Sequence, residues 1–200
     1  MFNKFGRALA ASMVLVLAVP ASGQQQFSDS YTFLKAVKER DGDKVSDLVA
    51  EPGSVVINTR DRSNGEGALH IVVRGRDLTW LTFLLGKGAR PDIQSNRGDT
   101  PLTLAAQIGW LDGAEQLLAR RAGVDVPNGR GETALILATQ RRDVPMVRML
   151  LARRADPNRT DRVAGMSALD YARQDPRAGA VLKLLEAKVA PARPAAGPAK

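Results

Sequence analysis

The chain has 200 residues, 44% of them hydrophobic, which is enough for one packed domain or two small ones. The chain has no cysteine and a single histidine, His70. This composition excludes disulfide scaffolds, thiol nucleophiles, cysteine-based zinc sites and metal motifs with two histidines. Its 29 Lys and Arg residues exceed its 21 Asp and Glu residues, and the net charge of +8 favours acidic or polyanionic partners. Aromatic residues, at 4%, are too few for a platform on which nucleic-acid bases stack.

Residues 1–23 have the pattern of a secretory signal peptide. Lys4 and Arg7 precede an apolar run over 8–19, and small residues suited to cleavage follow the run. The run is shorter than the ~20 apolar residues that a helix needs to span a bilayer. We therefore expect export to the periplasm or secretion, no transmembrane span after cleavage, and a linker at 24–30. The alternative is an uncleaved N-terminal anchor or a buried helix.

A unit of about 33 residues recurs through the rest of the chain. The stretch Gly98–Ala106 recurs at 131–139 and at 65–73, and more loosely at 166–172. Two leucine markers repeat in step, one a single leucine and the other a pair: Leu69, Leu102, Leu135 and Leu169; Leu84-Leu85, Leu117-Leu118, Leu150-Leu151 and Leu184-Leu185. A constant period of this size indicates a stacked array instead of separate domains.

Each unit reads as two short helices with a turn between them. In the copy that starts at Gly98, an apolar stretch at 102–106 is followed by a break, and apolar residues then stand three and four apart over 111–118. Thr100 suits the N-cap of the first helix and Pro101 its first position. Helices this short are unstable alone, so stacking has to hold the array together.

The repeats resemble those of the ankyrin family, through Thr100-Pro101-Leu102, Ala68-Leu69-His70 and Asp156-Pro157-Asn158. The resemblance implies an all-α, ankyrin-type solenoid of stacked helix–turn–helix repeats joined by hairpin loops, here in an exported bacterial protein. The expected divisions are a degenerate N-terminal capping repeat at 31–64, ankyrin-like repeats at 65–97, 98–130 and 131–164, a C-terminal capping repeat at 165–188, and a disordered Ala/Pro-rich tail at 189–200.

Several units depart from the family pattern where glycine is expected. The turn between the two helices has Gly109 in one copy, and the second helix of another copy ends near Gly88. Other copies have arginine or proline at these two places: Arg76, Arg142 and Pro176; Arg121 and Arg154. If the backbone is left-handed there, a side chain costs on the order of 1 kcal/mol, and proline requires a different turn. The loops after Asn58 and Asn158 share an extra residue, which we expect to lengthen two hairpins.

The sequence offers no reaction centre. It contains no G-x-S-x-G, P-loop or G-x-G-x-x-G motif, so we expect no enzyme, no cofactor, no metal and no small-molecule substrate. The ankyrin resemblance implies that His70 hydrogen-bonds the loop of the neighbouring repeat instead of acting as a base.

Arginines are frequent in the loops and after the first helices. Arg97 and Arg130 stand before the loop glycines, where the ankyrin family keeps an acidic residue. The resemblance implies that hairpin tips and first-helix faces line one concave surface. The arginines that follow the first helices are expected near its floor: Arg74, Arg76, Arg141, Arg142 and Arg173. Guanidinium groups there suit carboxylates or phosphates. The candidate partner-binding residues are Arg60, Arg62, Arg74, Arg97, Arg130, Arg141, Arg162 and Trp110.

We therefore expect a non-catalytic scaffold that binds another, acidic protein through this concave surface. The alternative function is binding of a polyanion, such as an acidic polysaccharide, lipid headgroups or nucleic acid, by the same basic face. The arginines can equally be ordinary solvated surface. Trp110 is either an exposed anchor or packed against the adjacent loop, and Trp80 is expected in the core.

Overall fold

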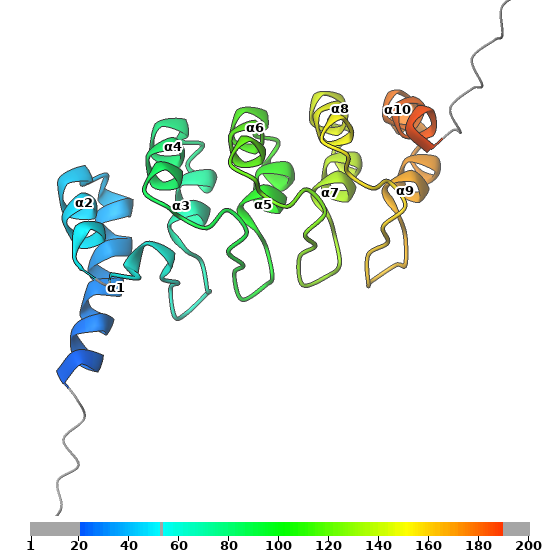
Figure 1. The fold of residues 1–200 in the computed structure, drawn as a ribbon. Coiled ribbons are helices and arrows are strands. Elements are labelled where there is room, and N and C mark those ends of the chain that lie inside the picture. Colours follow the sequence, from blue (N-terminus) through cyan, green and yellow to red (C-terminus); the bar gives the residue numbers. More distant parts are fainter. Residues whose placement is uncertain (1–20, 53, 190–200) are drawn as a thin grey trace, which may run out of the picture.

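Pairs of short helices succeed one another along the chain (Figure 1). The computed structural model describes residues 21–52 and 54–189. Its elements are α1 (Ala21–Glu39), α2 (Gly42–Ala50), η1 (Val56–Asn58), α3 (Ala68–Arg74), α4 (Leu78–Gly86), α5 (Pro101–Ile108), α6 (Leu111–Ala119), α7 (Ala134–Gln140), α8 (Val144–Ala152), α9 (Ala168–Gln174), η2 (Pro176–Ala178) and α10 (Gly179–Val189).

The helix pairs stand in two rows. Figure 1 shows α2, α4, α6, α8 and α10 in an outer row and α1, α3, α5, α7 and α9 in an inner row, with loops below the inner row. Within the inner row α3 packs on α5, α5 on α7 and α7 on α9. The described residues contain no β-strand, only isolated antiparallel bridges that pair Arg60 with Gly67 and Thr160 with Ser167. These bridges lie in the two hairpins that the extra residue is expected to lengthen.

The leucine markers form the core of the stack. Leu69, Leu102, Leu135 and Leu169 are buried, and so is at least one leucine of each pair in the second helices. On α5, Ala105 and Ala106 are fully buried, and their small side chains allow the neighbouring inner helices to approach closely. Burial of these apolar surfaces stabilises helices that are too short to persist alone.

Side-chain caps start the helices where the sequence predicts them. Thr100 accepts a hydrogen bond from the N–H of Thr103, and Pro101 is the first residue of α5. Thr133 and Asp143 cap α7 and α8 in the same way. Each cap gives a partner to an N–H group that the helix itself leaves free, and contributes about 1 kcal/mol to stability.

The turns that carry arginine in place of glycine take the left-handed conformation. Gly109, between α5 and α6, has a φ of 66°. Five arginines also have a positive φ: Arg40, Arg76, Arg121, Arg142 and Arg154. Each of them bears a strain on the order of 1 kcal/mol that glycine would not. Pro176 cannot adopt this conformation and begins the short helix η2 instead, so the turn differs there as the sequence predicts.

The first helix begins earlier than the sequence predicts. Residues 24–30, expected to be a linker, lie within α1, which starts at Ala21. This segment has no glycine or proline to interrupt a helix, and its glutamines favour one. The signal-peptide prediction for the residues before Ala21 and the tail prediction for 190–200 lie outside the described residues. No helix within 21–52 and 54–189 is long and apolar enough to cross a membrane.

Candidate functional site

Four side-chain acceptors shape the hairpins between the helix pairs. They recur at the repeat period: Asp61, Ser95, Asn128 and Asp161. The Oδ1 atom of Asn128 accepts hydrogen bonds from the N–H groups of Arg130 at 2.9 Å and Glu132 at 3.0 Å. Ser95 accepts two backbone N–H groups in the same way one hairpin earlier. Bonds of this kind fix tight turns. Sequence analysis missed these residues, although their common spacing is a signal that identifies them.

Successive hairpins are joined by backbone hydrogen bonds. An N–H of one hairpin donates to a carbonyl of the preceding one: Asn96 to Asn64 (2.9 Å), Gly129 to Arg97 (2.9 Å) and Arg162 to Arg130 (2.8 Å). A Cβ atom on Gly98 would lie 2.3 Å from the Gly129 nitrogen, so these hairpins touch backbone to backbone. The tips form one continuous surface, which we call the hairpin face (residues 59–67, 94–99, 127–132 and 160–167).

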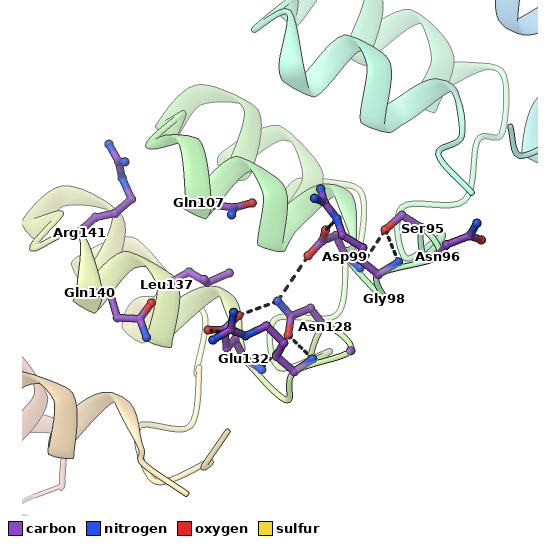
Figure 2. A pocket seen from close by; sticks show the side chains of 13 residues that line it. Ser95, Asn96, Gly98, Asp99, Gln107, Asn128, Glu132, Leu137, Gln140 and Arg141 are labelled. Atoms are coloured by element: carbon purple, nitrogen blue, oxygen red, sulfur yellow. Dashed lines mark hydrogen bonds and ion pairs between the residues drawn. The ribbon is translucent and has the colours of Figure 1, made fainter. Parts of the chain in front are cut away.

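Two nearly buried carboxylates hold arginines at this face. Asp99 and Glu132 are each 8% exposed. The Nε atom of Arg97 lies 3.2 Å from Asp99, and that of Arg130 lies 3.6 Å from Glu132. Asn128 joins the two pairs, because its Nδ2 donates to Glu132 at 2.9 Å and to Asp99 at 3.4 Å (Figure 2). Asp99 and Glu132 thus hold the side chains of Arg97 and Arg130 in position at the hairpin face.

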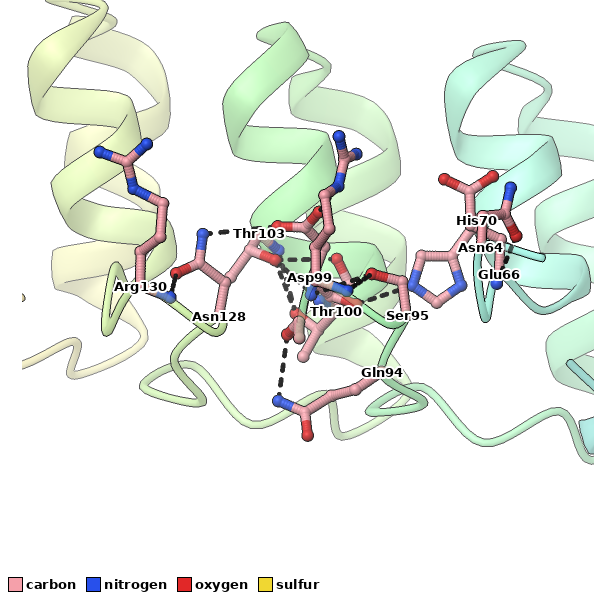
Figure 3. A network of polar contacts seen from close by, with 12 residues as sticks. Asn64, Glu66, His70, Gln94, Ser95, Asp99, Thr100, Thr103, Asn128 and Arg130 are labelled. Carbon is pink, nitrogen blue, oxygen red and sulfur yellow. Dashed lines mark hydrogen bonds and ion pairs between the residues drawn. The ribbon is translucent and has the colours of Figure 1, made fainter. Parts of the chain in front are cut away.

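His70 is fully buried and connects two repeats (Figure 3). Its Nδ1 accepts a hydrogen bond from the N–H of Gly67 at 3.1 Å, and its Nε2 lies 2.8 Å from the carbonyl oxygen of Asp99, to which it donates. Burial lowers the pKa of this imidazole below the usual 6.5. The bond to a neighbouring loop that was expected of His70 is therefore present.

Three of the predicted binding arginines line one cavity of about 960 Å³, and Figure 2 shows Arg141 apart from the hairpin side chains that line it. Arg97 and Arg130 reach it from the hairpins, and Arg141 from the end of α7. The Arg141 guanidinium packs over Gly109, where a Cβ atom would lie 2.7 Å from its Nη2 atom. The wall on the helix side is completed by Gln107, Leu137 and Gln140. Positive groups therefore stand on both the hairpin side and the helix side of this cavity.

A family model described as ankyrin repeats, in three copies, matches residues 69–161. This segment is an array of ankyrin repeats. With the helical stack seen in the described residues, the match shows the all-α, ankyrin-type solenoid that the sequence predicts. Ankyrin repeats imply a scaffold for protein–protein interaction and are typically non-catalytic. Across 21–52 and 54–189, no three His, Cys, Asp or Glu residues group together as a metal site would need.

Two smaller cavities continue the hairpin face of the ankyrin array towards α1. One of about 430 Å³ is lined in part by Arg74 and Arg97, and one of about 610 Å³ in part by Arg60 and Arg62. Arg74 pairs with a glutamate of its own repeat, and Arg60 donates to a carbonyl of the next hairpin. Arg162 lies on the last hairpin, outside the lining of these three cavities.

Trp110 is not an exposed anchor of the ankyrin array. Its side chain is 7% exposed at the start of α6, and a Cβ atom on Gly113 would lie only 2.1 Å from the indole ring. The missing side chain at Gly113 gives the indole room to pack against its own helix. Trp80 is half-buried against the core instead of fully inside it, with Phe83 edge-on at 5.2 Å and the Arg40 guanidinium 5.7 Å from its ring.

Arg76 and Arg142 join neighbouring units of the array and do not line the cavities of the hairpin face. Arg142 bonds the Oδ2 atom of Asp175 at 2.7 Å, and Arg76 donates to the carbonyl oxygen of Ile108. Arg40 reaches into the next helix pair in the same way. These three side chains therefore tie neighbouring helix pairs together, and neither Arg76 nor Arg142, both expected near the concave floor, lines the three cavities of the hairpin face.

Proposed function

We propose that the protein is a non-catalytic ankyrin scaffold that binds an acidic segment of another protein on its hairpin face. The observation that carries this proposal is the grouping of Arg97, Arg130 and Arg141 around one cavity of about 960 Å³. Guanidinium groups bind carboxylates through paired hydrogen bonds, and a cluster of them attracts acidic partners over long range.

The two hairpin arginines stay accessible although each is paired with a buried carboxylate, and this supports the proposal. Asp99 and Glu132 are satisfied by Asn128 and by one nitrogen of each arginine. The side chains of Arg97 and Arg130 remain 69% and 65% exposed. Each arginine is therefore held in position while most of its surface faces solvent, where a partner carboxylate can reach it.

Charge changes around the cavity test this function. Arg141→Glu is the cleanest reversal, because Asp99 and Glu132 are paired with Arg97 and Arg130 and the substitution leaves both of these pairs in place. We expect the affinity for an immobilised polyglutamate probe to fall by about tenfold or more, with thermal unfolding unchanged. Arg97→Gln, which removes a charge without adding one, should act in the same direction.

The matched control is Arg148→Glu, on the exposed side of the outer helix α8. It changes the net charge by the same amount as Arg141→Glu but should leave polyglutamate binding unaltered. Equal losses in both variants, together with heparin binding that falls steeply with salt, would contradict the proposal and indicate a diffuse polyanion-binding surface instead.

We also propose that the protein is exported to the periplasm or secreted. The support is the basic start at Lys4 and Arg7 and the apolar run at 8–19. The intact mass of the protein purified from its native cells should correspond to cleavage in the region from Ala21 to Gly23, so that the mature chain starts at Ser22, Gly23 or Gln24. A mass that includes the leader would contradict export with cleavage.

A further inference from the structure

The three cavities of the hairpin face lie next to one another in a line. The cavity of about 610 Å³ beside α1 shares Ser63 with the cavity of about 430 Å³, which in turn shares Asn96 and Arg97 with the cavity of about 960 Å³. We call this row of adjacent cavities, which runs along the hairpins from α1 to α7, the trough. Its two ends differ in chemistry.

The end beside α1 lacks the polar contact that His70 makes at the next junction. Leu34 stands six residues before the left-handed turn at Arg40, and His70 stands six residues before the left-handed turn at Arg76. Leu34 and His70 therefore occupy equivalent places in their repeats. His70 closes its junction by a hydrogen bond to the next hairpin. Leu34 has no polar group with which to do this. A cleft with an apolar floor is left between α1 and the first hairpin.

Tyr31 adds an aromatic ring to this cleft. Its exposed fraction is 72%, the highest of any large apolar side chain among the described residues whose burial is known. The residues of α1 that line the cleft follow one another at intervals of one or two helical turns and so share one face: Ser30, Tyr31, Leu34, Lys35 and Lys38. An exposed aromatic side chain at the mouth of a cavity is typical of a binding site.

The rim of the cleft is positively charged. Its single carboxylate, Asp61, is already bonded to the N–H and the hydroxyl of Ser63, which lower its pKa and keep it ionised. Four cations line the same cleft: Lys35, Lys38, Arg60 and Arg62. An occupant that fits has an apolar side chain for the floor and acidic groups for the rim.

We infer that the trough binds one extended acidic segment of the partner, with a large apolar side chain of that segment in the Tyr31 cleft. The inference rests on the proposed function, because Arg97 and Arg130 hold the acidic part. The first hairpin and the Arg130 hairpin are two repeats apart, about 20 Å at roughly 10 Å per packed helix. An extended chain covers about 3.3 Å per residue, so about six residues separate the apolar anchor from the carboxylate at Arg130.

Two fluorescein-labelled peptides of about twelve residues test the inference. Both consist of glutamate and serine; one has a phenylalanine at each end, so that it can bind in either direction, and the other has alanine at these places. The wild-type protein should bind the phenylalanine peptide about tenfold more tightly by fluorescence anisotropy. In Tyr31→Ala this preference should shrink to less than about twofold, because the aromatic wall is gone. Val163→Ala, a control at an exposed apolar side chain outside the trough, should keep it.

The outcomes separate the inference from the function on which it rests. If the wild-type protein shows no preference for phenylalanine, or if the preference survives in Tyr31→Ala, the inference is wrong. The proposed function still stands in that case, provided that Arg141→Glu weakens the binding of both peptides. If neither peptide binds the wild-type protein, the proposed function itself is overturned.

Discussion

The imidazole of His70 makes two hydrogen bonds that only its neutral form can make together. Nδ1 accepts the N–H of Gly67, and a proton on Nδ1 would abolish this bond. Burial also opposes the charged form and lowers the pKa, and it outweighs the opposite effects of Glu66 and Asp99. The ionisation of this one residue is therefore linked to the contact between two repeats.

We expect mild acid to destabilise the protein through His70. The unfolded chain binds a proton near pH 6.5 that the folded chain binds only at lower pH, so the free energy of unfolding should fall as the pH drops from about 6.5 towards 5. Carboxylates with a lowered pKa, such as Asp77 and Asp161, add to the loss only at more acidic pH. His70→Gln should have a lower free energy of unfolding than the wild-type protein, but this free energy should change less with pH between about 6.5 and 5. Urea titrations at several pH values measure both slopes, and equal slopes would rule out the linkage.

At the scale of helices and turns, Arg121 and Arg142 share a left-handed backbone conformation but differ in the contacts of their side chains. Arg121 follows α6 with a φ of 66° and an exposed side chain, while Arg142 follows α7 with a φ of 58° and bonds Asp175. Arg121→Gly should raise the free energy of unfolding by up to about 1 kcal/mol, because it relieves strain and removes no contact of this kind. Arg142→Gly should gain less or lose stability, because it also breaks the tie to the next helix pair.

Chemical denaturation of the two glycine variants measures this difference. Equal changes in stability would mean that the bond between Arg142 and Asp175 contributes nothing to the stack. Because both positions are exposed and both changes remove one positive charge, long-range electrostatics is similar in the two variants.

Helix starts and the stacking period could be predicted from the sequence because they depend on residues close together in the chain. The cap at Thr100 and the first helical position of Pro101 are examples. The separate roles of Arg141 and Arg142 could not be predicted, since they depend on the left-handed turn at Arg142. Arg141 lines the cavity of the hairpin face, while Arg142 bonds Asp175 of the next repeat. The burial of Trp110 depends on Gly113 one turn later, a signal that is visible in the sequence only once the helix is known.

In the whole molecule, the main packing contacts of the inner row are between adjacent units. The stability of such an array is close to a sum of unit and neighbour terms, so local damage stays local. A segment bound along the trough would contact several units at once and stabilise them together, by an amount that grows with its concentration relative to its Kd. Sequence analysis predicted the arginines of this face but not their connection, because the cavities are formed by side chains from different repeats.

The backbone hydrogen bonds that join successive hairpins all span the same number of residues and use only main-chain atoms. Nothing in that arrangement depends on how many copies precede or follow. Duplication of the stretch from Gly98 to Arg130 would add one more bond between hairpins and leave the other bonds in register. It would lengthen the hairpin face by one repeat, with a second copy of Arg130. A chain with one repeat more or fewer would thus keep the same bonds between its hairpins and have a longer or shorter hairpin face.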